Sequence, residues 1–276
     1  MRASVILPAS NEAKLIGDCL LAVLGSEWPQ GGALQVIVVA NGCRDATADV
    51  ARGYFDRFQA RGWQLDVIDR QLGGKLAALN DGDAAALAPL RIYLDADVTV
   101  DAGLLWSLVQ ALEVEQPCYA SGEVRITAKG WFSRAYARIW RQVPFMRSGV
   151  PGCGVFAVNA AGRARWGEFP AIISDDTFVR LSFAPEERIG VEPGYDWPIA
   201  EGFATLVKVR RRQDVGVEEV MARYPELQRN DDKSPFPMSE KLGIALRDPL
   251  GFVIYTAVAV MAKLTRSKTQ DWSRSR

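Results

Sequence analysis

Short apolar runs alternate with stretches of helical periodicity along the first half of the chain, which leaves few folds open to it. The apolar runs of four successive pairs read "ASVILP", "LQVIVVAN", "LDVIDR" and "RIYLDAD". Successive strand–helix units of this kind form a parallel sheet with helices on both faces. We therefore predict an α/β fold with a mainly parallel, Rossmann-like sheet.

The helices of the predicted units have recognisable ends. In the second unit, Asp45 is suited to the N-cap of a helix that Gly62 would terminate.

Beyond residue 115 the pattern is less regular. There we expect a helix in "WFSRAYARIWRQV", a helix beginning near Asp175, and strands in "RIGVEP" and "ATLVKVRR". We predict one main domain over 1–237, with halves 1–115 and 116–237, and a C-terminal helical segment over 238–276.

The ends of the predicted strands carry polar residues. Parallel α/β sheets bind their ligands at the carboxyl ends of the strands, so residues that follow different strands can meet there. Four stretches qualify: Pro8–Glu12, Asn41–Asp45, Gly73–Lys75, and Asp95–Asp97.

The acidic pair Asp95 and Asp97 is the first candidate for chemistry. Side chains two apart on a strand project to the same face, so these carboxylates would repel each other. A divalent cation with a phosphate companion would offset that repulsion. The alternative is an acidic turn that caps the next helix, with Asp101 as its N-cap.

Composition excludes several classes of function. The 33 basic and 33 acidic residues balance, so nothing in the global charge favours nucleic-acid binding. The chain contains no histidine, which removes His-based triads and most zinc sites, so acid–base chemistry falls to other side chains. The four cysteines form no C-x-x-C pair and the N-terminus has no apolar run typical of a signal peptide, so we expect reduced thiols in a cytoplasmic protein.

The most apolar segment is "PLGFVIYTAVAVMAKL", residues 249–264, and Arg266, Lys268, Arg274 and Arg276 follow it. It is shorter than the roughly 20 residues that a membrane-spanning helix needs. Two interpretations remain open: a helix packed on the domain, or a peripheral contact with the cytoplasmic face of a membrane.

No G-x-G-x-x-G follows the first strand, which argues against a dinucleotide cofactor. The ordered motifs "VILPASNE", "VVANGCRDATADVA", "GGKLAALNDG", "YLDADVTVD", "GCGVFAVN" and "SDDTFVRL" cover about residues 3–183. Together they resemble the family 2 glycosyltransferases, inverting enzymes with the GT-A fold. The resemblance implies a metal-dependent transfer of a sugar from a UDP- or GDP-sugar donor to an acceptor hydroxyl.

By this resemblance, the first two turns hold the base and ribose of the donor through Pro8, Ser10, Glu12 and Asn41. This chain departs from the family at Ala40–Asn41, where many members have two acids, so an amide replaces the carboxylate that meets the base. An ordinary turn at Asn41 is the alternative. Lys75, after two glycines at a helix start, is suited to the diphosphate; a solvated lysine is the other interpretation.

In the resembling family the Asp-x-Asp holds Mn²⁺ or Mg²⁺. Asp97 would be the direct ligand, and Asp95 would orient the ribose or a metal-bound water. Many relatives add a histidine ligand from the C-terminal half. Because this chain has none, water, phosphate oxygens or another side chain must complete the coordination.

The Glu-Asp motif of the family corresponds to Asp175 and Asp176, with Asp176 as the catalytic base and Asp175 in support. An N-terminal helix cap is the alternative role for this pair. The stretch "VRRRQ" over 209–213 either meets the diphosphate or is a solvated strand end.

Two further functions stay open. "LDADVT" also fits the motif of haloacid-dehalogenase-like phosphatases, in which Asp95 would be a nucleophile. A GT-A-like protein that binds nucleotides without turnover is the other. The aromatic and basic stretch 131–147 and the apolar C-terminus favour a lipid-linked acceptor.

Overall fold

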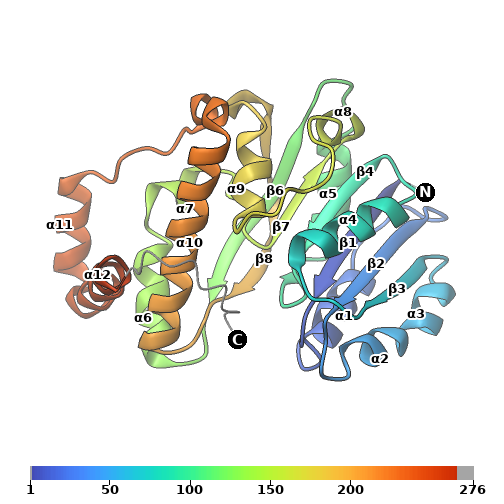
Figure 1. The fold of residues 1–276 in the computed structure, drawn as a ribbon, viewed down its shortest axis with the longest axis horizontal. Coiled ribbons are helices and arrows are strands. Elements are labelled where there is room, and N and C mark those ends of the chain that lie inside the picture. Colours follow the sequence, from blue (N-terminus) through green and yellow to red (C-terminus); the bar gives the residue numbers. More distant parts are fainter. Residues whose placement is uncertain (1, 266–276) are drawn as a thin grey trace.

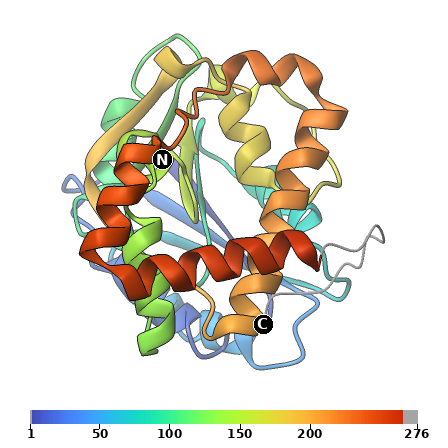
Figure 2. The same cartoon turned by 90° about the vertical axis from the view of Figure 1, so that its left-hand side faces the viewer.

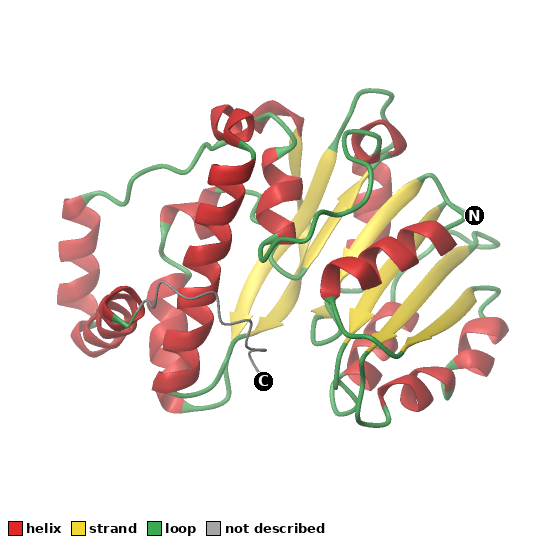
Figure 3. Cartoon of the chain, viewed as in Figure 1, coloured by secondary structure: helices red, strands yellow, loops and turns green. Residues whose placement is uncertain are grey.

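The computed structural model describes residues 2–265, and it contains one eight-stranded sheet flanked by helices (Figure 1). Figure 3 shows the sheet running through the molecule with helices on both of its faces. The strands are β1 Ala3–Ala9, β2 Leu34–Asn41, β3 Gln64–Arg70, β4 Leu90–Leu94, β5 Thr99–Val100, β6 Tyr119–Thr127, β7 Val155–Val158 and β8 Arg188–Pro198. Their order across the sheet is β3-β2-β1-β4-β7-β6-β8-β5.

The helices of the first half follow the strands as the α/β pattern predicts. They are α1 Ile16–Leu24, α2 Thr47–Arg52, α3 Phe55–Ala60, α4 Lys75–Ala85 and α5 Leu104–Ala111. The second half contributes α6 Trp131–Trp140, α7 Pro144–Ser148, α8 Ala160–Arg163, α9 Asp175–Leu181, α10 Phe203–Arg223, α11 Met238–Arg247 and α12 Pro249–Leu264. Short 3₁₀ helices cover Pro185–Glu187 and Pro225–Asn230.

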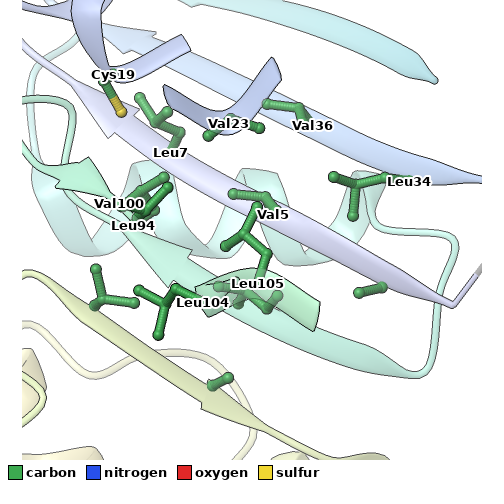
Figure 4. Close-up of a cluster of buried hydrophobic side chains, with 14 of the residues drawn as sticks. Val5, Leu7, Cys19, Val23, Leu34, Val36, Leu94, Val100, Leu104 and Leu105 are labelled. Carbon is green, nitrogen blue, oxygen red and sulfur yellow. The ribbon is translucent and has the colours of Figure 1, made fainter. Parts of the chain in front are cut away.

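Strands β1 to β4 form the parallel part of the sheet, and β1 and β2 are buried on both faces. Val5 and Leu7 of β1 point into one apolar cluster, while Ile6 between them belongs to another on the opposite face. Figure 4 shows the first cluster, where β1 and β2 side chains meet Cys19 and Val23 of α1. Burial on both faces explains why these strands are continuous apolar runs.

The second half turns the sheet into a mixed one. Strand β7 lies between β4 and β6 and is antiparallel to both, and β5 is antiparallel to β8. The predicted mainly parallel sheet is therefore correct for β1–β4, while antiparallel pairs join the second half to it.

Three local predictions were wrong. The helix expected between Asp45 and Gly62 is two helices, α2 and α3, separated at Gly53–Tyr54. The segment 204–211, expected as a strand, lies inside the 21-residue helix α10. Asp101 does not cap α5, because Gly103 holds the N-cap position and no side chain caps the helix; the Asp101 carboxylate instead accepts 2.7 Å hydrogen bonds from the Arg125 guanidinium.

The apolar segment 249–264 forms α12, which begins where the Asp248 carboxylate accepts a 2.9 Å hydrogen bond from the backbone N–H of Gly251. One face of α12 packs against α6 and α10 through Ile254, Val258 and Ala262. Within residues 2–265, no helix is long and apolar enough to cross a membrane. The basic residues predicted to follow it, Arg266, Lys268, Arg274 and Arg276, lie outside the described residues.

Candidate active site

A cleft of about 420 Å³ lies at the carboxyl ends of β1, β2 and β4, within the size range of small-molecule sites. A smaller pocket adjoins it and shares Pro8, Lys75, Asp95 and Asp175 with it. Every site residue predicted from the sequence lines one or both of these spaces: Pro8, Ser10, Glu12, Asn41, Lys75, Asp95, Asp97, Asp175 and Asp176. Residues more than 160 positions apart are thus brought to one edge of the sheet.

Lys75 links the two acidic motifs of the cleft. Its Nζ lies 3.0 Å from Oδ1 of Asp95 and 3.0 Å from Oδ2 of Asp175. Although burial lowers the pKa of Lys75, the charges of Asp175, Asp95 and Asp176 outweigh it and hold that pKa above its ordinary value. The lysine is therefore a cation throughout the physiological pH range, and it remains 40% exposed to the cleft.

Asp175 and Asp176 have different surroundings although they are neighbours at the start of α9. The Asp175 side chain is only 6% exposed and is paired with Lys75. Burial and the adjacent charge of Asp175 raise the pKa of Asp176 to about 6. Its Oδ1 accepts a 2.7 Å hydrogen bond from the Thr177 N–H. The helix cap considered from the sequence does not form, because Ser174 holds the N-cap position of α9 and no side chain makes a capping hydrogen bond there.

Asp95 and Asp97 follow β4 and line the main cleft. The Asp95 N–H donates a 2.8 Å hydrogen bond to the carbonyl of Gly154, which ties this turn to the loop before β7. Gly154 has a φ of +80°, and a Cβ there would lie 2.8 Å from Val98 and 2.9 Å from Trp197. A side chain at position 154 would thus displace the acidic turn.

The carboxylate oxygens in the cleft suit a hard divalent cation that also binds phosphate. Within residues 2–265, no group of three His, Cys, Asp or Glu side chains is arranged to hold a metal on its own. Mg²⁺ and Mn²⁺ accept one or two carboxylates when substrate phosphates and water supply the remaining ligands. The oxygens of Asp95 and Asp97 fit that requirement, whereas an all-protein cage would not form.

Asn41 connects two of the loops at this edge. Its Oδ1 accepts a 2.6 Å hydrogen bond from the Gly74 N–H, immediately before α4, and its Nδ2 donates to the Ala9 carbonyl at 3.4 Å. The adjacent Gly42 has a φ of +58°, and a Cβ there would lie 2.7 Å from the Gly73 nitrogen. The amide at position 41 therefore positions the loop that carries Lys75, in addition to lining the cleft.

The first two turns are also joined by hydrogen bonds. The Asp45 carboxylate accepts from the N–H groups of Ala13 and Thr47, both at 3.1 Å, and the Glu12 N–H donates to the Thr47 hydroxyl at 2.9 Å. Asp45 is therefore not the N-cap that the sequence predicted, because Ala46 holds that position and α2 begins at Thr47, but its carboxylate joins the two turns. The Ser10 hydroxyl oxygen is buried and finds no partner among the described residues, which suits a group that awaits a ligand.

The sequence did not predict that a helix, α10, lines the side of the cleft opposite the strands. Arg210, Arg212 and Gln213 line the cleft from α10 instead of ending a strand. The same cleft has apolar lining residues on α6, on α10 and just before α10, and we call this part of the lining the apolar arm: Tyr136, Trp140, Ile199, Leu206 and Val209. The signal that could have revealed the helix is the i,i+4 spacing of Arg210 and Asp214, which form an ion pair at 3.1 Å.

The sheet order and the position of the cleft define the GT-A fold of glycosyltransferases. The chain belongs to glycosyl transferase family 2, because residues 4–165 match the model of that family. Among curated proteins, it is 34% identical over 95 residues to the glycosyltransferase AglE of Haloferax volcanii, covering 34% of this chain and 30% of that protein. The match thus spans less than a third of that relative.

Solved structures agree on the fold. The mannosyltransferase PcManGT from Pyrobaculum calidifontis, in complex with GDP-Man and Mn²⁺, matches 96% of this chain and 76% of its own, with a TM-score of 0.59 and 19% identity. Glucosyl-3-phosphoglycerate synthase from Mycobacterium tuberculosis, in complex with Mn²⁺ and UDP-glucose, matches 80% of this chain and 78% of its own, with a TM-score of 0.53 and 19% identity. Family membership leaves the phosphatase interpretation without support.

Proposed function

We propose that the chain is a metal-dependent, inverting glycosyltransferase that moves a sugar from a nucleoside-diphosphate donor to an acceptor hydroxyl. The observation that carries this proposal is the contact of Lys75 with both acidic motifs, at 3.0 Å from Asp95 and from Asp175. A diphosphate that entered the cleft would meet the lysine, the Asp-x-Asp and the proposed base within one small volume.

The donor would lie along the strand ends. Pro8, Ser10, Glu12 and Asn41 line the part of the cleft proposed for the base and ribose. Lys75, at the start of α4, would meet the diphosphate together with the orphan N–H groups of that helix end. Arg212 and Gln213 would approach it from α10.

Asp97 and Asp95 would hold Mn²⁺ or Mg²⁺, and the ion would neutralise the charge that develops on the leaving diphosphate. The structures of PcManGT and of glucosyl-3-phosphoglycerate synthase were both determined with Mn²⁺ and a nucleotide-sugar, which supports a divalent ion here. The donor would be a UDP- or GDP-sugar.

Asp176 would act as the base. The acceptor oxygen forms its bond to the anomeric carbon while the bond from that carbon to the diphosphate oxygen breaks, so the electron pair leaves with the nucleoside diphosphate. The acceptor proton passes to the Asp176 carboxylate. Because attack comes from the face opposite the leaving group, the configuration inverts.

The apolar arm supports an acceptor with a hydrophobic part, such as a lipid-linked sugar or a lipid alcohol. Of its lining residues, the half-buried Trp140 and Val209 offer such a group aromatic and aliphatic surface, while Tyr136 and Leu206 are buried. We place the reaction in the cytoplasm because all four cysteines are free thiols.

Ligand-dependent melting tests the donor and metal sites. UDP or GDP with Mn²⁺ should raise the melting temperature more than nucleotide or Mn²⁺ alone, because a ligand that binds only the folded state stabilises it. In Asp97→Asn the nucleotide should still bind weakly, but the additional shift from Mn²⁺ should vanish. Asp196→Asn, at an acid that does not line the cleft, is the matched control and should behave like wild type. An undiminished Mn²⁺ effect in Asp97→Asn would remove Asp97 from the metal site.

A further inference from the structure

Helix α12 is apolar over most of its circumference, with Thr256 and Lys263 as its exposed polar residues, although it lies at the surface. Its inner face packs on α6 and α10, and Tyr255 stacks on Tyr136 with ring centroids 5.1 Å apart. Its outer face carries Leu250, Val253 and Leu264, which are 57%, 63% and 75% exposed. A largely hydrophobic helix is normally buried on both sides, but within residues 2–265 nothing covers this outer face.

Helix α11 extends the same apolar face. Its residues Met238, Leu242 and Leu246 recur every four positions and are 75%, 62% and 77% exposed. Figure 2 shows α11 and α12 together on one side of the molecule, with α12 crossing in front of α6 and α10. We call the exposed apolar residues of these two helices the α11–α12 face: Met238, Leu242, Leu246, Leu250, Val253, Val260, Met261 and Leu264.

The charges around this face are mostly positive. Residues 238–264 contain Lys241, Arg247 and Lys263, and only two acids, Glu240 and Asp248. Both acids form ion pairs with arginines outside the two helices, Glu240 with Arg147 and Asp248 with Arg138, each at 2.8 Å. In the sequence, residues 266–276 add four bases and one acid directly after α12.

We propose that the α11–α12 face docks on a lipid bilayer that contains anionic headgroups. Exposed leucines accompanied by lysine and arginine are the pattern of helices that lie in the membrane interface, and basic residues draw such helices to anionic lipid. A second copy of the chain, paired face to face, would bring like charges together and is therefore disfavoured. The proposal does not depend on the transfer reaction.

Docking in this way would bring the cleft close to the membrane. Tyr136 lines the apolar arm of the cleft and stacks on α12, and Arg210 donates a 3.3 Å hydrogen bond from Nη1 to the Tyr255 hydroxyl. Only the thickness of α12 then separates the arm from the lipid. If the acceptor of the proposed reaction is lipid-linked, this arrangement shortens its path to the cleft.

Co-sedimentation of the full chain with vesicles tests the proposal. We expect binding to phosphatidylglycerol–phosphatidylcholine vesicles and little to phosphatidylcholine alone. The double variant Leu242→Gln/Leu246→Gln should lose about tenfold or more in vesicle affinity, because two apolar side chains no longer leave water. The matched control is Leu72→Gln/Leu87→Gln, whose leucines are 77% and 68% exposed but lie away from α11 and α12. It should bind like wild type.

A second variant tests the charges without touching the leucines. Arg247→Gln/Lys263→Gln should weaken binding to anionic vesicles about fivefold for each charge removed. Equal binding of wild type to neutral vesicles, or wild-type binding by the leucine variant, would overturn the proposal. The proposal would also fail on a third result: wild type does not bind vesicles and is a dimer by light scattering, whereas the leucine variant is a monomer. The α11–α12 face would then be an interface between two copies of the chain.

Discussion

The division of roles between Asp175 and Asp176 follows from their partners. Asp175 is held by Lys75 at 3.0 Å and its side chain is almost fully buried, so this ion pair occupies its carboxylate. Burial and the charge of Asp175 raise the pKa of Asp176 to about 6, near the value that suits a base at neutral pH. These differences support the assignment of Asp176 as the base, although both residues occupy the same acidic motif.

The pH profile tests this electrostatic arrangement. A base with a pKa of about 6 must be ionised to act, so kcat/KM should fall as the pH decreases through that value. The positive charge of Lys75 lowers the pKa of Asp176, so Lys75→Met should move this acidic limb to higher pH, whatever it does to the maximal rate. Lys129→Met, at an exposed lysine outside the cleft, is the control. If the acidic limb of the kcat/KM profile stays at the wild-type pH in Lys75→Met, then Lys75 does not act on the base.

Among the elements, α10 shows where sequence patterns mislead. Its start, "ATLVKVRR", has the β-branched residues and partial alternation of a strand, yet the segment is the first part of a 21-residue helix. Tertiary packing overrides local propensity here, because Leu206 and Val207 are buried beside α6 and α12. The change of element type moved Arg212 and Gln213 from a predicted strand end to the wall of the cleft.

The loop before α2 and the loop before α4 approach each other closely, and Gly42 lies at the point of contact. Gly42→Ala adds a Cβ 2.7 Å from the Gly73 nitrogen, so the loops must separate and the hydrogen bond from Gly74 to Asn41 should weaken. We expect a loss of about 1–3 kcal/mol in the free energy of unfolding by urea denaturation. Binding of nucleotide with Mn²⁺ should weaken as well.

Gly31→Ala separates backbone strain from this close approach. Gly31 has a similar φ of +74°, but nothing lies within 4 Å of a Cβ there. This control should cost about 1 kcal/mol from strain alone and leave nucleotide binding unchanged. If the two variants lose the same stability and both bind nucleotide normally, the contact between the loops does not position Lys75.

For the whole molecule, the sequence predicted the N-terminal half, in which strands and helices alternate and each has a local hydrophobic pattern. Apolar runs and helical periodicity specify β1–β4 with their helices, and the strand ends then place Ser10, Asn41 and Asp95 at one edge. The position of β7 between β4 and β6 depends on antiparallel pairing between distant segments, which no local pattern encodes. Asp175 and Asp176 were found through family motifs, and only the fold of the second half brings them to Lys75.

Turnover by Asp176→Asn tests the central claim, a transferase whose base is separate from its donor site. Asn keeps the size of Asp and its hydrogen bond with the Thr177 N–H, but it cannot take a proton. The variant should melt at or above the wild-type temperature and bind nucleotide with Mn²⁺ normally. Release of nucleoside diphosphate from the donor, with acceptor or with water in its place, should fall about 10²- to 10⁴-fold. Asp175→Asn should be milder. Wild-type turnover by Asp176→Asn, with normal folding and binding, would contradict the account.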